Sequence, residues 1–207
     1  MLSSNLGSLH LIFQVLFRNA VLVSTLALVA GPSHASLITN GDFETGNYTG
    51  WTLTNAEIYD GVCRTGSQMG AAICDVHGGL YAMSFGHAGA VTSFTQTLAT
   101  YAGQDYTLSF WLANDNAQDA PVTTFQVLWN GVSIYSLASP QPSFAYTQLT
   151  FAVKATGSST VLEFRAQQDP SQWFLDDVTV NTPEPGSALL LGAALVVLVG
   201  LGRKRAL

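Results

Sequence analysis

A rhythm of short alternating segments and turns runs through the chain from residue 36 to residue 182. Turn-forming residues recur roughly every 8–12 positions, and no helical periodicity lasts beyond about two turns. The clearest junction is Asn130-Gly131, because both residues of a tight hairpin turn must accept positive φ angles. We expect about nine strands, at residues 52–58, 80–85, 92–98, 106–112, 123–129, 132–137, 146–153, 160–166 and 173–180.

This pattern predicts an all-β domain in which two sheets pack face to face, as a sandwich or jelly roll. Residues 36–182 are enough for one domain with its own core, and too few for two comfortable ones.

The charge of this domain excludes one class of partner. It holds three basic residues (Arg64, Lys154 and Arg165) and twelve acidic ones, a net charge of −9. A nucleic-acid binder needs a basic face to neutralise phosphates, so that function is excluded. Anionic membranes are poor partners for the same reason, whereas cations and neutral sugars suit the charge.

The N-terminus has the features of a signal peptide. Arg18 precedes an uncharged apolar run at residues 20–30, and the small residues Ser33 and Ala35 follow it. Signal peptidase requires small side chains near the cut, so we expect residues 1–35 to be removed by cleavage after Ala35. The alternative is an uncleaved N-terminal anchor, for which the run is short.

The C-terminus has three segments in a fixed order. Pro183-Glu184-Pro185 is followed by an apolar segment at residues 188–202 and then by Arg203, Lys204 and Arg205. The apolar segment is about 15 residues, or roughly 22 Å as a helix, against a bilayer core of about 30 Å that flanking basic side chains help to span. The basic end would stay in the cytoplasm, which places the domain outside the inner membrane.

This order resembles the PEP-CTERM sorting signal, a tail also known as the ice-binding protein C-terminal domain. The resemblance covers residues 183–207 and implies no binding of ice. It implies a Gram-negative host, a membrane exosortase that cuts near Pro183-Glu184-Pro185, and delivery to the cell surface or extracellular matrix. Two prolines keep the motif extended and deny it backbone donors, which suits a protease-like site. An ordinary C-terminal anchor is the alternative.

Cys63 and Cys74 form the chain's cysteine pair. In an exported protein such a pair most often forms a disulfide. The alternative is a metal site that recruits His77 and His87, but the spacing matches no familiar ligand pattern.

Two segments resemble galactose-binding-like, carbohydrate-binding β-sandwich modules. Residues 37–46, read LITNGDFETG and followed by Gly50-Trp51, resemble their first strand, and residues 173–180, read WFLDDVTV, resemble their last. The resemblance implies that these strands lie close together, with a structural calcium between them.

The resemblance implies that the carboxylates of Glu44 and Asp176 are calcium ligands, with the backbone carbonyl of Asp42 as a weaker third. Calcium takes six to eight hard oxygens, so the chemistry is reasonable. The strand period places Asp176 on the face of Phe174 and Val178, which predicts an inward carboxylate if those residues pack. A cation would offset the cost of burying it. In the alternative, turn amides satisfy Asp176 and Glu44 lies in solvent.

Trp111 and Trp129 interrupt the apolar alternation of their strands and could stack on sugar rings, whereas core packing is the ordinary role of tryptophan. Trp51 and Trp173 lie in the two resembling segments and are expected to be structural.

No catalytic motif is present. His77 and His87 lie in glycine-rich stretches typical of solvated turns. A carboxylate pair for glycoside hydrolysis needs only spatial proximity, and nothing singles out two among Glu57, Asp60, Asp75, Asp115, Asp119 and Glu163.

These observations predict an exported, non-catalytic surface or matrix protein whose sandwich binds or embeds in extracellular polysaccharide. A purely structural or adhesive protein without a saccharide ligand is the first alternative. A small glycoside hydrolase is the second. The fold alone does not distinguish them.

Overall fold

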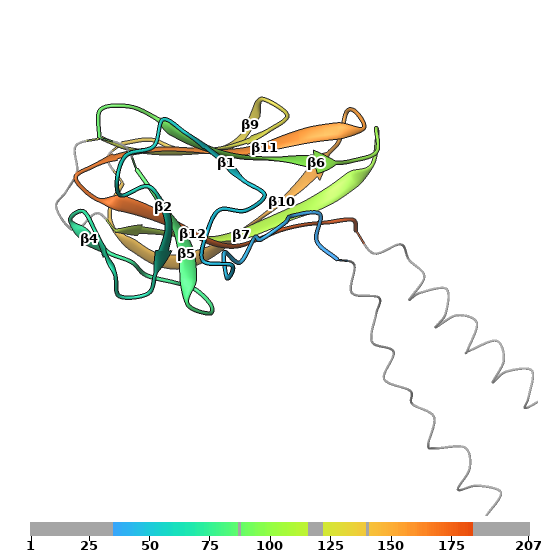
Figure 1. Cartoon of the computed structure of the whole chain (residues 1–207). Helices are drawn as coiled ribbons and strands as arrows, with labels where there is room; N and C mark the ends of the chain where they lie inside the picture. Colours follow the sequence, from blue (N-terminus) through green and yellow to red (C-terminus); the bar gives the residue numbers. More distant parts are fainter. Residues whose placement is uncertain (1–34, 87, 116–121, 140, 184–207) are drawn as a thin grey trace, which may run out of the picture. The chain divides into compact units, whose positions relative to one another are not determined.

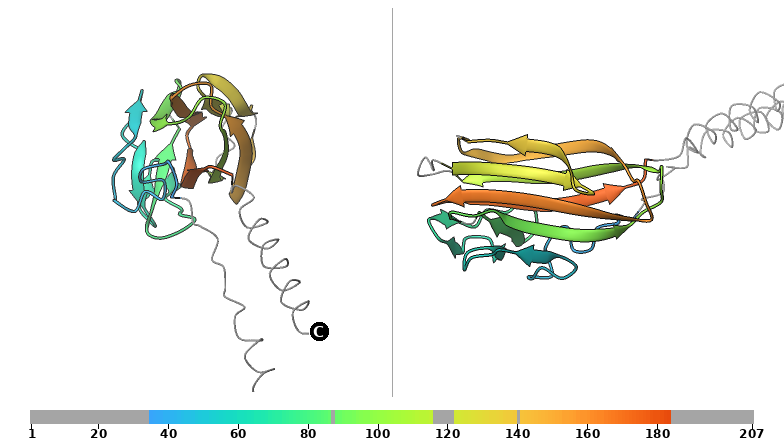
Figure 2. Two further views of the ribbon diagram at one scale, coloured as in Figure 1. Left: turned by 90° about the vertical axis from the view of Figure 1, so that its right-hand side faces the viewer. Right: turned by 90° about the horizontal axis from the view of Figure 1, so that it is seen from above.

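The computed structural model describes residues 35–86, 88–115, 122–139 and 141–183. Within these ranges, a pair of antiparallel five-stranded sheets lie face to face (Figure 1, Figure 2). The first sheet contains, in spatial order, β1 (Thr52–Thr54), β6 (Thr92–Ala99), β11 (Ser159–Asp169), β8 (Val122–Trp129) and β9 (Val132–Leu137). The second contains β10 (Phe144–Lys154), β7 (Asp105–Asp115), β12 (Gln172–Asn181), β5 (Tyr81–Phe85) and β2 (Gly61–Arg64). A small hairpin joins β3 (Gln68–Met69) to β4 (Ala72–Ile73).

The all-β sandwich is confirmed, and each expected strand has a counterpart. Asn130 and Gly131 form the β8–β9 turn with φ angles of 51° and 80°. The strand expected at residues 52–58 is shorter than predicted. Asn55 takes a φ of 61°, which ends β1 after Thr54. Three short strands, β2 to β4, were missed, since two to four residues show no alternation.

Aromatic side chains fill the space between the sheets. Trp51 stacks on Phe94 with ring centroids 4.3 Å apart, and Phe110 meets Phe164 edge to face at 5.1 Å. Trp51 and Trp173 are buried, in agreement with their expected structural role. All described members of this core lie between Leu37 and Val180, within the domain predicted at residues 36–182.

The two ends of the domain lie together, as the resemblance implied. Leu37 N–H donates to the Val180 carbonyl and Val178 N–H to the Gly41 carbonyl, each at 2.8 Å. A methyl group on Gly41 would come 2.0 Å from the Val178 carbonyl oxygen, so only glycine allows this approach.

A disulfide between Cys63 and Cys74 confirms the predicted pair. It closes a segment that packs over the outer face of the second sheet, against Phe174 and Ala113. We call residues 63–79 the disulfide segment; its β4 strand lies at one side of the molecule in Figure 1.

The predicted orientation of Asp176 needs correction. Its side chain is fully buried, but it points to the outer face with Phe174, beneath the disulfide segment. Val178 instead packs in the core between the sheets. A bulge between Asp176 and Thr179, with Asp177 at a φ of 49°, changes the alternation.

Candidate functional site

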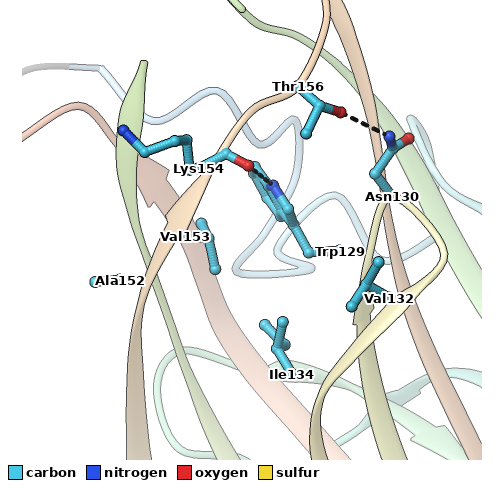
Figure 3. A pocket seen from close by; sticks show the side chains of 8 residues that line it. All are labelled: Trp129, Asn130, Val132, Ile134, Ala152, Val153, Lys154 and Thr156. Atoms are coloured by element: carbon cyan, nitrogen blue, oxygen red, sulfur yellow. Dashed lines mark hydrogen bonds between the residues drawn. The ribbon is translucent and has the colours of Figure 1, made fainter. Parts of the chain in front are cut away.

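A pocket of about 400 Å³ opens between β9 and β10, the edge strands of the two sheets (Figure 3). We call it the edge pocket. Its lining consists of Trp129, Asn130, Val132, Ile134, Ala152, Val153, Lys154 and Thr156. Most of these residues carry no sequence signal for a site, because β9 and β10 are not paired with each other and their approach depends on how the sheets stack.

The walls of the edge pocket are apolar. Val132 and Ile134 come from β9, and Ala152 and Val153 from β10. Val132 is 67% exposed. The pocket therefore offers exposed apolar surface.

Trp129 forms the inner end of this pocket and is 5% exposed. Its indole N–H donates to the Lys154 carbonyl at 2.9 Å, so it is not free to bind a ligand hydroxyl. Hydrogen-bonding groups lie on the rim, where Asn130 Nδ2 donates to Thr156 Oγ1 at 3.1 Å. The Lys154 ammonium pairs with Asp105 at 2.7 Å. Trp129 thus closes the inner end of the pocket with little exposed ring surface, and the rim contributes polar atoms.

Trp111 lies on the outer face of the second sheet and is half-buried. The imidazole of His77 stacks on it with ring centroids 3.7 Å apart, and Tyr146 approaches His77 edge-on at 5.7 Å. The stack covers one face of Trp111, so sugar stacking there stays a prediction that concerns the remaining ring surface.

His77 is more than a solvated turn residue. Its Nδ1 lies 2.6 Å from Asp177 Oδ2, and its side chain is 30% exposed. The Tyr146 hydroxyl donates to the Asp75 carbonyl at 3.0 Å, two residues before His77. These contacts fasten the end of the disulfide segment to β10 and β12.

Glu44, in the loop before β1, and Asp176, on β12, are two of the three expected calcium ligands, and both approach one turn. Glu44 Oε1 accepts the N–H groups of Leu80 and Tyr81, each at 2.8 Å. Asp176 Oδ2 accepts those of His77 at 2.9 Å and Gly78 at 3.1 Å. The turn amides that the alternative to calcium expects at Asp176 are thus present, whereas Glu44, expected in solvent under that alternative, also accepts two amides.

Burial raises the pKa of Asp176 to about 6, although three backbone amides favour its charged form. Burial also raises the pKa of Tyr146 above its usual range, and Asp176 adds to this effect. No group of three or more His, Cys, Asp or Glu side chains suited to a metal occurs in the described residues. Asp42 Oδ1 accepts the Glu44 N–H at 3.4 Å. The side chains supply two carboxylates for a cation, and the remaining oxygens would have to come from the backbone.

The expected carboxylates for hydrolysis do not gather at the edge pocket, whose lining contains no acidic residue. Asp60 accepts hydrogen bonds from the Glu57 and Gly86 amides and from Thr92. Arg165 Nε donates to Glu163 Oε1 at 2.7 Å. Asp119 and His87 lie outside the described residues.

Both processing segments also lie outside the described residues, apart from Ala35 and Pro183 at their borders. Among the described residues between these borders, no helix is long and apolar enough to cross a membrane. The signal peptide and the sorting tail therefore stay predictions.

No family model matches this chain, and no curated protein matches its sequence. Among solved structures, a cyclase from Fischerella sp. TAU shares 16% identity at a TM-score of 0.53, with 73% of this chain and 98% of that chain covered. The enzymatically active domain of tailspike protein 4 from bacteriophage CBA120 shares 16% identity at a TM-score of 0.50; the match covers 72% of this chain and only 21% of the tailspike chain. The xylan-binding domain of Paenibacillus barcinonensis Xyn10C shares 14% identity, with 75% and 99% covered and a TM-score of 0.49.

At identities this low, likeness shows the fold alone. The chain is similar to β-sandwich domains found in proteins that differ in activity. Its function has to be argued from its own surface.

Proposed function

We propose that the domain at residues 36–182 is a non-catalytic saccharide-binding module of an exported bacterial surface protein, and that the edge pocket holds the ligand. The observation that carries this proposal is the pocket itself, an open concavity with an aromatic inner end, apolar walls and a polar rim.

The chemistry of the pocket suits a sugar ring. Its volume of about 400 Å³ is within the range of small-molecule sites. The C–H face of a pyranose would lie against the aliphatic walls, with the small exposed part of Trp129 at the inner end. Its hydroxyls would reach Asn130 and Thr156 on the rim. The net charge of −9 on residues 36–182 favours neutral saccharides over acidic ones.

The non-catalytic character of the module is inferred from the lining. Hydrolysis of a glycosidic bond uses two carboxyl groups that flank it, and the edge pocket is lined by none. A reducing-end assay on each bound glycan tests this point, because release of sugar by the purified domain would contradict it.

A glycan-binding screen on purified residues 36–182 tests the proposal directly. Val132→Asp places a carboxylate in the apolar wall and should weaken binding at least tenfold. Val161→Asp is the matched control, since Val161 is also exposed but lies on β11, outside the lining. Equal glycan binding by both variants would mean that the ligand binds outside the edge pocket. No glycan binding by the folded wild type would favour the structural or adhesive alternative.

Structural calcium is a separate element of the proposal, at Glu44 and Asp176. Its support is that both carboxylates approach the turn at residues 77–81. Calcium added to the chelated domain should raise its melting temperature, and Glu44→Gln should reduce that rise. An unchanged melting temperature would mean that the turn amides suffice.

Export and sorting complete the proposal. Mass spectrometry in the native host should find the mature chain starting after Ala35 and cut near Pro183-Glu184-Pro185. Replacing Pro183, Glu184 and Pro185 by alanine should leave the tail attached. Unchanged processing would contradict a role for an exosortase.

A further inference from the structure

Buried polar side chains gather at one end of the sandwich, where β7 ends and β12 begins. The edge pocket lies at the other end of β7. Lys154, which lines that pocket, pairs with Asp105, the first residue of β7. Asn114, Gln168 and Trp173 are 2%, 1% and 0% exposed there. We call these three residues the polar triad.

Hydrogen bonds to backbone carbonyls fix the orientation of both amides in the triad. Asn114 Nδ2 donates to the Pro142 carbonyl at 3.0 Å, and Gln168 Nε2 donates to the Asp115 carbonyl at 2.9 Å. Their oxygens therefore point away from these carbonyls. Asn114 Oδ1, Gln168 Oε1 and Trp173 Nε1 have no hydrogen-bond partner among the described residues of the chain.

These atoms share one neighbourhood. Asn114 and Trp173 are register partners on β7 and β12. Gln168 reaches across from the other sheet to the backbone at Asp115, the residue after Asn114. Asn181 Oδ1, another buried atom without a partner in the described ranges, lies at the far end of β12 and is not a member of this group.

The chemistry of the triad is complementary to one small molecule. Two amide oxygens accept hydrogen bonds and one indole N–H donates. Water donates two hydrogen bonds and accepts up to two, and a buried water typically makes about three hydrogen bonds to groups that the protein leaves unsatisfied. The rings of Phe125 and Phe144 lie 5.3 and 5.9 Å from that of Trp173, so apolar groups surround the site and do not replace its missing partners.

We propose that the polar triad binds an internal water molecule that bridges β7, β11 and β12. This water ties the two sheets together at the end where Asn114 donates to the Pro142 carbonyl, and where Gln168 and Ser171 donate to the Asp115 carbonyl. The site is independent of the edge pocket and of the proposed saccharide.

Water–protein Overhauser spectroscopy on labelled residues 36–182 tests this site without any variant. The Trp173 indole proton should show a cross-peak to water with the sign of long residence. Trp51 and Trp129 are controls in the same chain, because their indoles donate to the Asn40 and Lys154 carbonyls. They should show no such peak.

A crystal structure of the same domain provides the second readout. It should contain a water peak within hydrogen-bond distance of at least two of the three atoms. A Trp173 indole without a long-lived water contact would overturn the proposal. So would a structure in which Trp173 Nε1 donates directly to a protein oxygen.

Discussion

The surroundings of Trp111 and Trp129 differ. Both residues interrupt the alternation of apolar and polar side chains along their strands, β7 and β8. Trp111 projects from the outer face of the second sheet, where His77 of the disulfide segment stacks on one face of its ring and leaves it half-buried. Trp129 lies at the end of β8, where the indole donates to the Lys154 carbonyl and the ring lines an open pocket.

The difference shows how each surface is maintained. The covered face depends on an added segment, held by a covalent bond and by contacts of His77, Asp176 and Asp177. The edge pocket depends on the stacking of the two sheets and on the hydrogen bonds that Trp129 and Asn130 donate across it. Changes to the first region should therefore alter stability, and changes to the wall of the second should alter binding.

Removal of the disulfide is expected to cause the largest loss of stability in the first region. Cys63→Ser with Cys74→Ser should lower the free energy of unfolding by roughly 2–3 kcal/mol, because the closed loop no longer restricts the unfolded chain. Denaturant unfolding measures this loss. Glycan binding by the molecules that remain folded should be unchanged, and an equal loss of binding would mean that the two regions are coupled.

The sequence predicts the strands better than it predicts which side chains meet. Residues 132–137 form a strand at the expected positions because the turn at Asn130-Gly131 fixes where it starts. The faces of β12 were half wrong, since the bulge after Asp176 moves Val178 into the core. A bulge depends on the partner strand, which a local pattern does not show.

The candidate site likewise depends on contacts that the local sequence pattern does not show. Cys63 and Cys74 were paired correctly because they are the two cysteines of a chain expected to be exported. The edge pocket could not be predicted, because its walls come from strands that share no hydrogen bonds. Its position depends on the packing of large core side chains between the sheets.

The second prediction is that the stability of the fold depends on pH through Asp176. Its folded pKa of about 6 exceeds the unfolded value of 3.8, so the folded state holds the extra proton between these values. The contribution of Asp176 to stability is therefore complete below about pH 4, is lost as the pH rises through about 6, and is constant above it.

Asp176→Asn removes this titration. The difference in unfolding free energy between wild type and variant, measured with chelator present, should decrease from pH 4 to pH 7. We expect the change to be of the same order as that from the disulfide, since a pKa raised from 3.8 to about 6 corresponds to roughly 3 kcal/mol. A pH-independent difference would contradict the raised pKa.

A smaller effect is expected from Trp129→Phe. The ring surface largely remains, but the Lys154 carbonyl loses its indole donor. Loss of one such hydrogen bond costs about 1 kcal/mol. Trp51→Phe is the matched control, because Trp51 donates to the Asn40 carbonyl at 3.1 Å. Thermal unfolding of both variants should show similar losses, while only Trp129→Phe should alter glycan affinity.

The smallest effect is expected from His77→Ala on the covered face. The variant loses the stack on Trp111 and the contact with Asp177, yet the His77 and Gly78 amides still bind Asp176. Because the imidazole is 30% exposed, we expect a loss of about 0.5–1 kcal/mol, the scale of one aromatic pair. Trp111 fluorescence should shift towards that of a solvated indole. If the shift occurs and glycan affinity also rises, the uncovered Trp111 is itself a saccharide surface, and the division between a covered structural face and an open binding edge no longer holds.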